Sequence, residues 1–352
     1  MTKKLTIRLM WFAVITGMIS FFGLFILAGN GVFGEMPEFE QLENPNTNLA
    51  TQIISSDGEI LGKFYFNDNR TPITYNELPK NLVDALIATE DERFYDHPGI
   101  DVRSTLRAIA FLNTRGGAST ISQQLARQLF VGVRSRNIVQ AVLQKAKEWV
   151  LAIQIEKRYT KNEIIAMYLN IYDFNNTADG VRSASKIYFN KTPDSLLIED
   201  AAMLIGMLKN SSLYNPLRRP ELVIERRNVV FQQMERNKMI TTKERDSLSS
   251  LPLNIDYTPE SHREGLATYF RAYLQEFMNN WLRENPKEDG SRYNLYRDGL
   301  RIYLKPGKYT IQLDAIFTKS PKLIEVPAIS GGNMSSQEIF FGGLNINKIC
   351  IE

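Results

Sequence analysis

The feature that most constrains the fold is an uncharged apolar run near the N-terminus. Residues 9–28 are 20 consecutive residues without a charged side chain. A helix of this length spans about 30 Å, the thickness of the hydrocarbon core of a bilayer. Residues 1–8 carry three basic side chains and the segment after the run is acidic. By the positive-inside tendency, the run predicts a transmembrane helix with residues 1–8 in the cytoplasm and the rest of the chain outside.

A cleavable signal peptide is the alternative interpretation of this run. The run is longer than the usual apolar region of a signal peptide, and no small-x-small cleavage site stands out at its end. We therefore expect a retained anchor.

Composition limits the chemistry of the remaining chain. With 43% hydrophobic and 23% charged residues, the 352-residue chain can form one large packed domain or two ordinary ones. A net charge of +3 is too balanced for a protein that wraps nucleic acid, so no nucleic-acid partner is expected. One cysteine and two histidines exclude a disulfide framework and make a Cys/His zinc site unexpected. Catalysis is therefore expected to use carboxylates, lysines and arginines.

Local patterns divide the chain after the apolar run. Residues 29–48 include a stretch rich in Pro, Glu and Asn and are interpreted as a linker. Residues 49–78 predict a small β element, because a Ser-Asp-Gly turn separates two runs of aliphatic and aromatic residues. Residues 79–250 carry helical periodicity and capping signals. The expected fold class is mainly α, with a small β element and an N-terminal transmembrane helix.

Four segments concentrate more polar residues than a helical core requires. They are ATEDERFYDHPGID (88–101), GGASTISQQLARQLF (116–130), QKAKEWVLAIQIEKRY (144–159) and KNEIIAMYLN (161–170). In this order they resemble the motifs of the peptidoglycan glycosyltransferases, family 51, found in class A penicillin-binding proteins. The patterns E-D-x-x-F-x-x-H-x-G, G-x-S-T-I-x-Q-Q-L and K-x-x-I-x-x-x-Y-L-N are met in full. R-K-x-x-E is met except at Gln144, where the family usually has arginine. Four ordered motifs within about 80 residues are far more specific than any one alone.

The resemblance covers roughly residues 50–300 and implies a lysozyme-like helical glycosyltransferase domain at 79–250. It also implies a single-pass protein of the bacterial inner membrane with a periplasmic catalytic domain. The implied reaction polymerises lipid II into glycan strands by inverting glycosyl transfer, with release of undecaprenyl diphosphate. The expected partners are lipid II, the growing strand, the bilayer and cell-wall synthesis proteins.

Two carboxylates are the expected catalytic residues. Glycosyl transfer passes through an oxocarbenium-like transition state, and the attacking hydroxyl needs a base. The resemblance implies that Glu90 is this base, acting on the 4-hydroxyl of the acceptor N-acetylglucosamine. Glu148 lies three residues after Lys145 on the same helix face and is expected to orient Lys145 or a metal ion. Taken alone, either glutamate would more often belong to a solvated charged surface.

The expected spacing and cofactors follow from the same chemistry. By analogy with inverting sites, the carboxylates of Glu90 and Glu148 should be roughly 6.5–9.5 Å apart or more. A divalent cation, Mg²⁺ or Mn²⁺, is a candidate cofactor near Glu148, although no complete ligand set is visible. No organic cofactor is expected.

Further site residues come from the same motifs. Hydroxyl and amide groups around a helix N-terminus suit sugars and phosphates, although capping alone would explain Thr120 and Gln123. Basic residues compensate the charge of a departing diphosphate, and Arg127 or Lys147 is expected to replace the arginine missing at Gln144. The predicted substrate-binding residues are Asp91, Ser119, Thr120, Gln123, Gln124, Arg127, Lys145 and Lys147. Structural roles are expected for Phe94, His97, Gly99 and Asn170.

Apolar residues flank the second motif. The resemblance implies that this neighbourhood dips into the membrane beside the donor site, while ordinary core packing explains it equally well. The residues concerned are Phe111, Leu112, Leu129, Phe130, Val131 and Val133.

The C-terminal part of the chain departs from the family. The resemblance ends at YRDGLRIY, so residues 251–303 are interpreted as a linker toward a transpeptidase domain that this sequence does not show. Residues 304–352 are interpreted as an atypical, poorly ordered tail, and the chain as a truncated product. Ser183 and Lys186 match the S-x-x-K of penicillin-reactive domains, but no partner box completes it, so the match is interpreted as coincidence.

Two alternative functions stay open. A lysozyme-like lytic enzyme also uses a glutamate in a helical domain, but a hydrolase has no diphosphate for the basic third motif to bind. A catalytically silent scaffold for cell-wall synthesis is favoured by the unusual tail and disfavoured by the retained Glu90 and Glu148.

Overall fold

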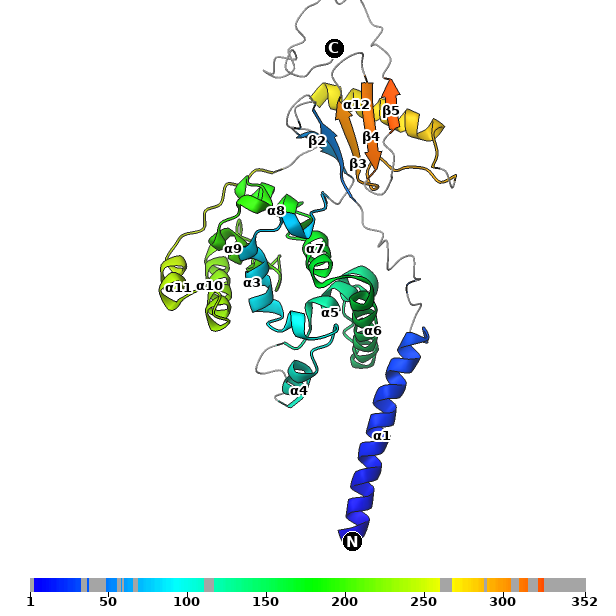
Figure 1. Cartoon of the computed structure of the whole chain (residues 1–352), viewed down its shortest axis with the longest axis vertical. Coiled ribbons are helices and arrows are strands. Elements are labelled where there is room, and N and C mark those ends of the chain that lie inside the picture. The colour runs from blue at the N-terminus through cyan, green and yellow to red at the C-terminus, as the bar shows by residue number, and fades with distance from the viewer. Residues whose placement is uncertain are drawn as a thin grey trace, which may run out of the picture.

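A computed structural model describes most of the chain. The described residues are 3–32, 37, 49–55, 58, 60–65, 69–110, 117–259, 268–287, 290–304, 310–315 and 322–325. An N-terminal helix, a helical domain and a smaller domain with a sheet follow one another along the long axis of the molecule (Figure 1).

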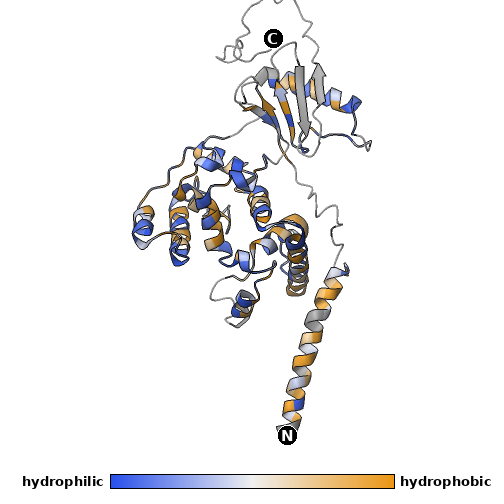
Figure 2. Cartoon of the chain, viewed as in Figure 1, coloured by the Kyte–Doolittle hydropathy of each residue, from blue (hydrophilic) through white to orange (hydrophobic). Residues whose placement is uncertain are grey.

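The predicted membrane span is one helix, α1 (Lys3–Gly29). Among the described residues, its Leu5–Gly29 segment is the one stretch long and apolar enough to cross a membrane. Apolar residues predominate along α1 (Figure 2), and many of their side chains are exposed. A helix that is apolar all round and not covered by protein is suited to an apolar environment.

The end of α1 contacts the helical domain. Phe25 stacks on Trp149 of helix α6 (Ile138–Arg158), with ring centroids 5.4 Å apart. Ala28 is buried in the same region. The C-terminal end of α1, the predicted membrane span, therefore packs directly on α6, the helix that carries the third motif.

The helical domain consists of short and medium helices around one hydrophobic core. Its helices are α3 (Lys80–Glu90), α4 (Val102–Ala110), α5 (Ile121–Ala126), α6, α7 (Lys161–Ile171), α8 (Gly180–Phe189), α9 (Ile198–Met207), α10 (Pro220–Arg236) and α11 (Thr242–Ser249). Single turns η1 (Tyr75–Glu77), η2 (Phe94–Asp96) and η4 (Pro193–Ser195) and a π-helical turn, η3 (Arg127–Val131), connect them.

The packing of these helices places the four motifs together. Helices α3, α9 and α10 pack on one another, while α5 packs on both α6 and α7. The first motif follows α3, the second forms α5, and the third and fourth lie on α6 and α7. Buried Leu86, Ile121, Leu151 and Tyr168 belong to one cluster that joins these helices. The mainly α-helical fold class predicted from the sequence is confirmed.

Segments on either side of the helical domain form one five-stranded sheet, in the order β2-β1-β3-β4-β5. The strands are β1 (Thr51–Ile54), β2 (Ile60–Phe64), β3 (Leu300–Leu304), β4 (Thr310–Ala315) and β5 (Lys322–Glu325). β1 pairs in parallel with β3, and the other neighbours are antiparallel. Helix α12 (Thr268–Glu284) covers one face, and its Leu274 and Met278 share a core with Leu300 and Ile302.

This sheet differs from the domain boundaries expected from the sequence. The predicted β element at 49–78 supplies only two strands, and the segments interpreted as linker and tail supply α12, β3, β4 and β5. The Leu300 N–H donates to Thr51 Oγ1 across 249 residues of sequence. Local periodicity could not show this pairing, because a two-stranded hairpin gives no sign of a distant third strand. Residues 326–352 lie outside the described part of the chain.

Candidate active site

Glu90 ends α3 and is bound by an amide from α5. Its Oε2 accepts a 2.9 Å hydrogen bond from Gln124 Nε2. Gln124 Oε1 accepts a 2.9 Å hydrogen bond from the hydroxyl of Tyr168 on α7. Burial, reinforced by the charge of Glu90, raises the pKa of Tyr168 well above its usual value, so the hydroxyl stays protonated. Because Tyr168 engages the oxygen of the Gln124 amide, the NH₂ group must face Glu90.

Lys145 and Glu148 form the second polar cluster, on α6. Lys145 Nζ lies 2.9 Å from Ser119 Oγ, 3.0 Å from Gln123 Oε1 and 2.8 Å from Glu148 Oε2. Glu148 is 5% exposed and Gln123 is 1% exposed. Two of the three groups that bind the Lys145 ammonium are therefore buried. The sequence-predicted pair of Lys145 with Glu148 is thus joined by two of the other predicted residues, Ser119 and Gln123.

The electrostatics of Lys145 are set by burial and by neighbouring charges. The pKa of Lys145 lies below its usual value because burial outweighs the opposing charge of Glu148, and because Arg127 and Arg134 add positive charge. The positive charge of Arg127 also acts on Tyr168. The charge of Arg127, at the start of η3, therefore acts on both clusters, whereas Lys147 is a half-buried residue of α6.

Helix α5 connects the two carboxylates. Gln123 and Gln124 are consecutive residues, and they contact Lys145 and Glu90 respectively. Consecutive helical residues point in directions about 100° apart, since a turn has about 3.6 residues. The Glu90 carboxylate and the cluster around Lys145 are therefore bound on different sides of the first turn of α5. The expected spacing of the carboxylates of Glu90 and Glu148 stays a prediction.

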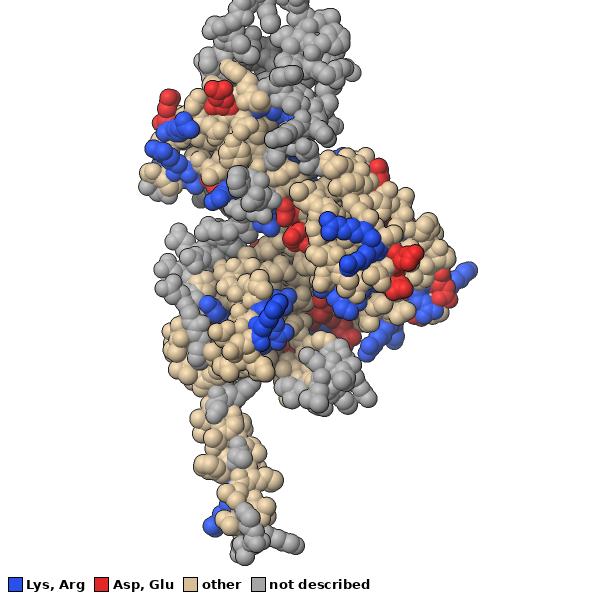
Figure 3. Space-filling view, turned by 180° about the vertical axis from the view of Figure 1, so that it is seen from behind, with Lys and Arg blue, Asp and Glu red and all other residues tan. Residues whose placement is uncertain are grey.

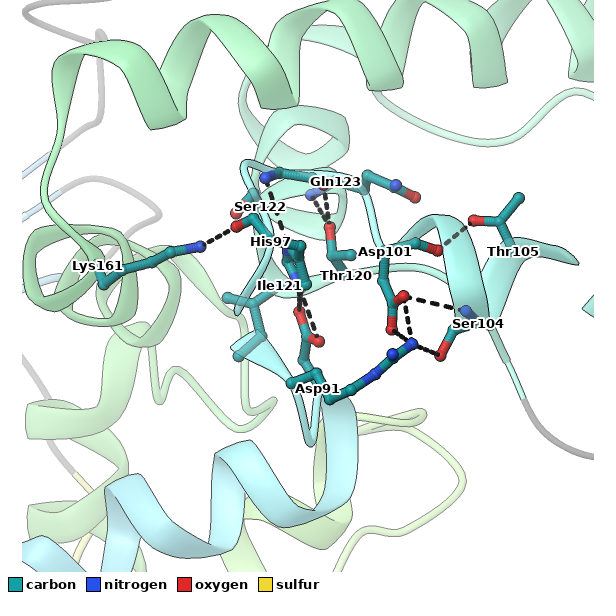
Figure 4. A network of polar contacts seen from close by, with 12 residues as sticks. Asp91, His97, Asp101, Ser104, Thr105, Thr120, Ile121, Ser122, Gln123 and Lys161 are labelled. Carbon is teal, nitrogen blue, oxygen red and sulfur yellow. Dashed lines mark hydrogen bonds and ion pairs between the residues drawn. The ribbon is translucent and has the colours of Figure 1, made fainter. Parts of the chain in front are cut away.

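Asp91 and His97 fix the loop after Glu90 to the start of α5 (Figure 4). The buried Asp91 carboxylate accepts hydrogen bonds from the Ile121 N–H at 3.0 Å and from His97 Nε2 at 3.1 Å. His97 Nδ1 accepts a 3.2 Å hydrogen bond from the Gly99 N–H, so the ring proton lies on Nε2. Asp91, predicted to bind substrate, is engaged within the protein.

Thr120 and Gly99 close the same loop. Thr120 Oγ1 accepts from the Gln123 N–H at 3.1 Å and donates to the Gly99 carbonyl at 2.6 Å. Gly99 has a positive φ of 94°, and a Cβ there would lie 2.9 Å from the carbonyl oxygen of Ala152. Thr120, also predicted to bind substrate, is the N-cap of α5 and is 1% exposed.

A third group of contacts lies behind this loop. Lys161 Nζ donates to the His97 carbonyl at 2.6 Å, pairs with Glu156 at 2.8 Å and lies 4.3 Å above the ring of the buried Phe94. Ser122 also donates to Glu156. These contacts bind α7 and α6 to the loop that follows Glu90.

Asn170 lies in the last turn of α7 and is hydrogen-bonded to Ile73. Its side chain accepts from the Ile73 N–H at 2.9 Å and donates to the Ile73 carbonyl at 2.8 Å. It therefore ties α7 to the segment that precedes η1.

Sequence reasoning missed the contributions of Tyr168, Glu156 and Arg134. Tyr168 lies in the fourth motif and Glu156 in the third, but their contacts depend on α6 and α7 both facing α5. Residue spacing within one motif does not show this arrangement. Arg134 lies between motifs, where no pattern marked it.

The apolar residues near the second motif divide into two groups. Leu129, Phe130 and Val131 are half-buried and pack against the core, whereas Val133 is 94% exposed. Phe111 and Leu112 lie outside the described residues. Further exposed apolar residues on the first turns of α6 are Ile138, Val139 and Val142.

Charged side chains are spread over the globular part, whereas α1 shows charge only near its N-terminal end (Figure 3). Among the described residues there is no group of three or more His, Cys, Asp or Glu side chains that could hold a metal ion. The Glu148 carboxylate already binds Lys145. A divalent cation near Glu148 stays a prediction.

The site thus combines a glutamate held by an amide donor with a cationic cluster at the same short helix, within a helical domain. The chain belongs to the transglycosylase family, whose family model matches residues 57–235. The resemblance predicted from the four motifs, and the enzyme class with it, is confirmed.

Several curated relatives share this region. Penicillin-binding protein 1A of Escherichia coli (strain K12) is 35% identical over 275 residues, which cover 76% of this chain and 30% of the relative. Penicillin-binding protein 1A of Vibrio cholerae is 32% identical over 295 residues, covering 82% and 33%. A crystal structure of penicillin-binding protein 1A from Haemophilus influenzae is 22% identical, with a TM-score of 0.37, and the match covers 73% of this chain and 26% of that one. The chain spans about a third of the length of the curated relatives it matches.

Proposed function

We propose that the chain is a peptidoglycan glycosyltransferase that joins lipid II units into glycan strands and releases undecaprenyl diphosphate. One observation carries the proposal: the first turn of α5 holds Glu90 through Gln124 and the Lys145–Glu148 pair through Gln123. The reaction needs a base on one side of the reacting carbon and anion stabilisation on the other.

In the proposed mechanism, Glu90 is the general base. The 4-hydroxyl of the acceptor N-acetylglucosamine attacks C1 of the lipid-linked N-acetylmuramic acid while Glu90 takes the hydroxyl proton. The bond between C1 and the diphosphate oxygen breaks, and the configuration at C1 inverts. Among the described residues, only Oε2 of Glu90 is engaged in a hydrogen bond, which leaves Oε1 for the acceptor.

The leaving group is stabilised by the cationic cluster. Lys145 and Arg127 neutralise the diphosphate as negative charge develops on it. Glu148 positions Lys145 through a 2.8 Å ion pair and favours the charged ammonium against the effect of burial. Glu148 therefore acts on the leaving group through Lys145.

A position at the membrane surface is part of the proposal. The end of α1 packs on α6, and exposed apolar side chains occupy the start of α6 and the preceding loop, including Ile138 at 80% exposure. A substrate with a polyprenyl tail must be met at the bilayer, and such side chains can enter its interface. With the basic N-terminus in the cytoplasm, the catalytic domain lies in the periplasm of a bacterial cell.

To test the proposal, the full chain is incubated with lipid II and, separately, with finished glycan. With lipid II the product should be a glycan ladder that grows with time. With finished glycan no soluble fragments should appear. Fragments from finished glycan would establish the lytic alternative, and inactivity on both substrates would favour the silent scaffold.

A further inference from the structure

Residues 69–73, the junction segment, lie between β2 and η1 and join the sheet to the helical domain. The Arg70 carbonyl accepts a 2.8 Å hydrogen bond from the Ala50 N–H, directly before β1. β1 lies inside the sheet, between β2 and β3, so this contact attaches the segment to an inner strand. Connections usually run over the protein surface, yet Asn69 is fully buried. The junction segment is therefore packed into the structure at the start of β1.

Helices α7 and α8 bind the same segment. The Asp179 carboxylate, directly before α8, accepts a 2.8 Å hydrogen bond from the Asn69 N–H, and the Ser183 hydroxyl donates to the Asn69 carbonyl. Arg70 Nη2 donates to the carbonyl of Ile171, the last residue of α7, at 3.2 Å. Asp179 and Ser183 are both buried, and a buried carboxylate that loses a donor is destabilised. The junction segment is therefore fixed to the helical domain through its backbone.

Asn170, in the last turn of α7, binds the end of the junction segment. Its side chain accepts from the Ile73 N–H at 2.9 Å and donates to the Ile73 carbonyl at 2.8 Å. The start of α8 contacts the same turn, because the Gly180 N–H donates to the Tyr172 carbonyl at 2.9 Å. A Cβ at Gly180 would lie 2.6 Å from the Asn170 carbonyl oxygen. The end of α7 and the start of α8 therefore cannot shift independently, and both are bound to the junction segment.

This end of α7 lies close to the residue that orients the candidate base. Tyr168 precedes Asn170 by two residues, which is about 3 Å along the helix axis. Its hydroxyl donates to Gln124 at 2.9 Å, and Gln124 donates to Glu90. A hydrogen bond is lost when its heavy atoms are more than about 3.5 Å apart, so a shift of α7 by about 1 Å would break the contact of Tyr168 with Gln124. The position of α7 therefore decides whether the Gln124 amide is held toward Glu90.

We propose that Asn170 and Asp179 are positioning residues of the active site, which bind the junction segment and so hold α7 where Tyr168 engages Gln124. The sheet thereby contributes to catalysis, although the contacts of Glu90 described above come from the helical domain. The inference rests on the proposed function, because the reaction of Glu90 is its readout. The donor diphosphate is assigned to the cluster around Lys145, so loss of either positioning residue should lower kcat and leave KM for lipid II nearly unchanged.

The test measures kcat and KM of lipid II polymerisation by the full chain in detergent. Asn170→Ala removes both hydrogen bonds to Ile73 and should lower kcat about tenfold, with KM changed less than about twofold. Asp179→Ala should act in the same direction. Asp179→Asn keeps an oxygen that can accept from the Asn69 N–H, so it should recover most of the loss. Thr241→Ala removes the N-cap of α11 and is the control, with kcat within about twofold of the native value.

A double variant tests the route through Tyr168. Tyr168→Phe removes the hydroxyl that Asn170 is proposed to position. The double variant should therefore have a kcat within about twofold of Tyr168→Phe alone, because both changes act through one hydrogen bond. Hydrogen exchange of the full chain, followed by mass spectrometry of peptides from α7, should be about tenfold faster in the last turn of α7 for Asn170→Ala than for Thr241→Ala. Thermal unfolding of each variant checks that the fold is kept.

The outcomes separate the two proposals. If the native chain polymerises lipid II and Asn170→Ala keeps the native kcat, or if its loss multiplies with that of Tyr168→Phe, Asn170 does not position Glu90 and the proposed function stands. If the native chain does not polymerise lipid II, the proposed function falls, and with it the catalytic role of both positioning residues. Unchanged hydrogen exchange of α7 in Asn170→Ala would show that Asn170 does not hold this helix, whatever the activity.

Discussion

At the scale of single residues, the site depends on side chains that orient other side chains. Glu90 and Glu148 could be selected from the motifs, because their spacing to other polar residues is local. The hydroxyl of Tyr168 could not, because its effect on Glu90 passes through Gln124 on another helix. Likewise, Asp91 and Thr120 have polar side chains suited to sugars, but the structure engages both in closing the loop.

Tyr168→Phe tests this orientation. Without the hydroxyl, the Gln124 amide can turn over and present its oxygen to Glu90, so kcat should fall about tenfold while KM changes little. The missing hydrogen bond should cost about 1 kcal/mol of stability. Tyr172→Phe is the matched control, because the Tyr172 hydroxyl donates to the Met207 and Leu208 carbonyls instead. Equal kcat for the two variants would contradict the assigned role.

The lowered pKa of Lys145 predicts how kcat/KM depends on pH. Its pKa lies below the usual 10.5, mainly because of burial, so the free enzyme should lose the ammonium charge at lower pH than an ordinary lysine would. Donor binding needs that charge, and kcat/KM should therefore decline on the alkaline side below pH 10.5. In Lys145→Arg the decline should move to higher pH, because arginine stays protonated. An unchanged alkaline limb would assign the titration to another group.

At the scale of elements, helices were predictable and their junctions were not. The helical periodicity and capping signals of residues 79–250 correspond to real helix starts: Asn137 caps α6, and Thr241 with Glu244 forms a complete capping box at α11. Caps and amphipathic faces are local signals. The loop from Asp91 to Gly99 is held by contacts with α5, α6 and α7, which depend on tertiary packing.

Substitution of Gly99 tests the packing of that loop. In Gly99→Ala, the positive φ and the contact with the Ala152 carbonyl should lower the free energy of unfolding by about 2 kcal/mol or more. Polymerisation should fall as well, because the loop begins directly after Glu90. Gly117→Ala, where a Cβ meets nothing within 4 Å, should change stability by less than about 0.5 kcal/mol. Chemical unfolding of both variants measures the difference, and equal stabilities would refute the close packing at Gly99.

At the scale of the whole molecule, composition predicted α1, but nothing local predicted the five-stranded sheet. An apolar run of sufficient length needs no partner to be recognised. The sheet needs β1 to pair with β3 across 249 residues, and α12 to cover the strands that result. The contact between Phe25 and Trp149 could not be predicted either, because nothing in the sequence marks one of these aromatic residues as the partner of the other.

The proposed mechanism requires that Glu90 removes the proton of the acceptor hydroxyl during polymerisation of lipid II. Its most direct test is the initial rate of glycan formation by the full chain, compared for Glu90→Gln and Glu92→Gln. Glu92 is exposed in the loop directly after Glu90, and its change removes an equal charge. We expect a loss of at least about 100-fold for Glu90→Gln, in keeping with the loss of a general base, and a change below about twofold for Glu92→Gln. Glycan formation by Glu90→Gln at the native rate would contradict the assignment of Glu90 as the base.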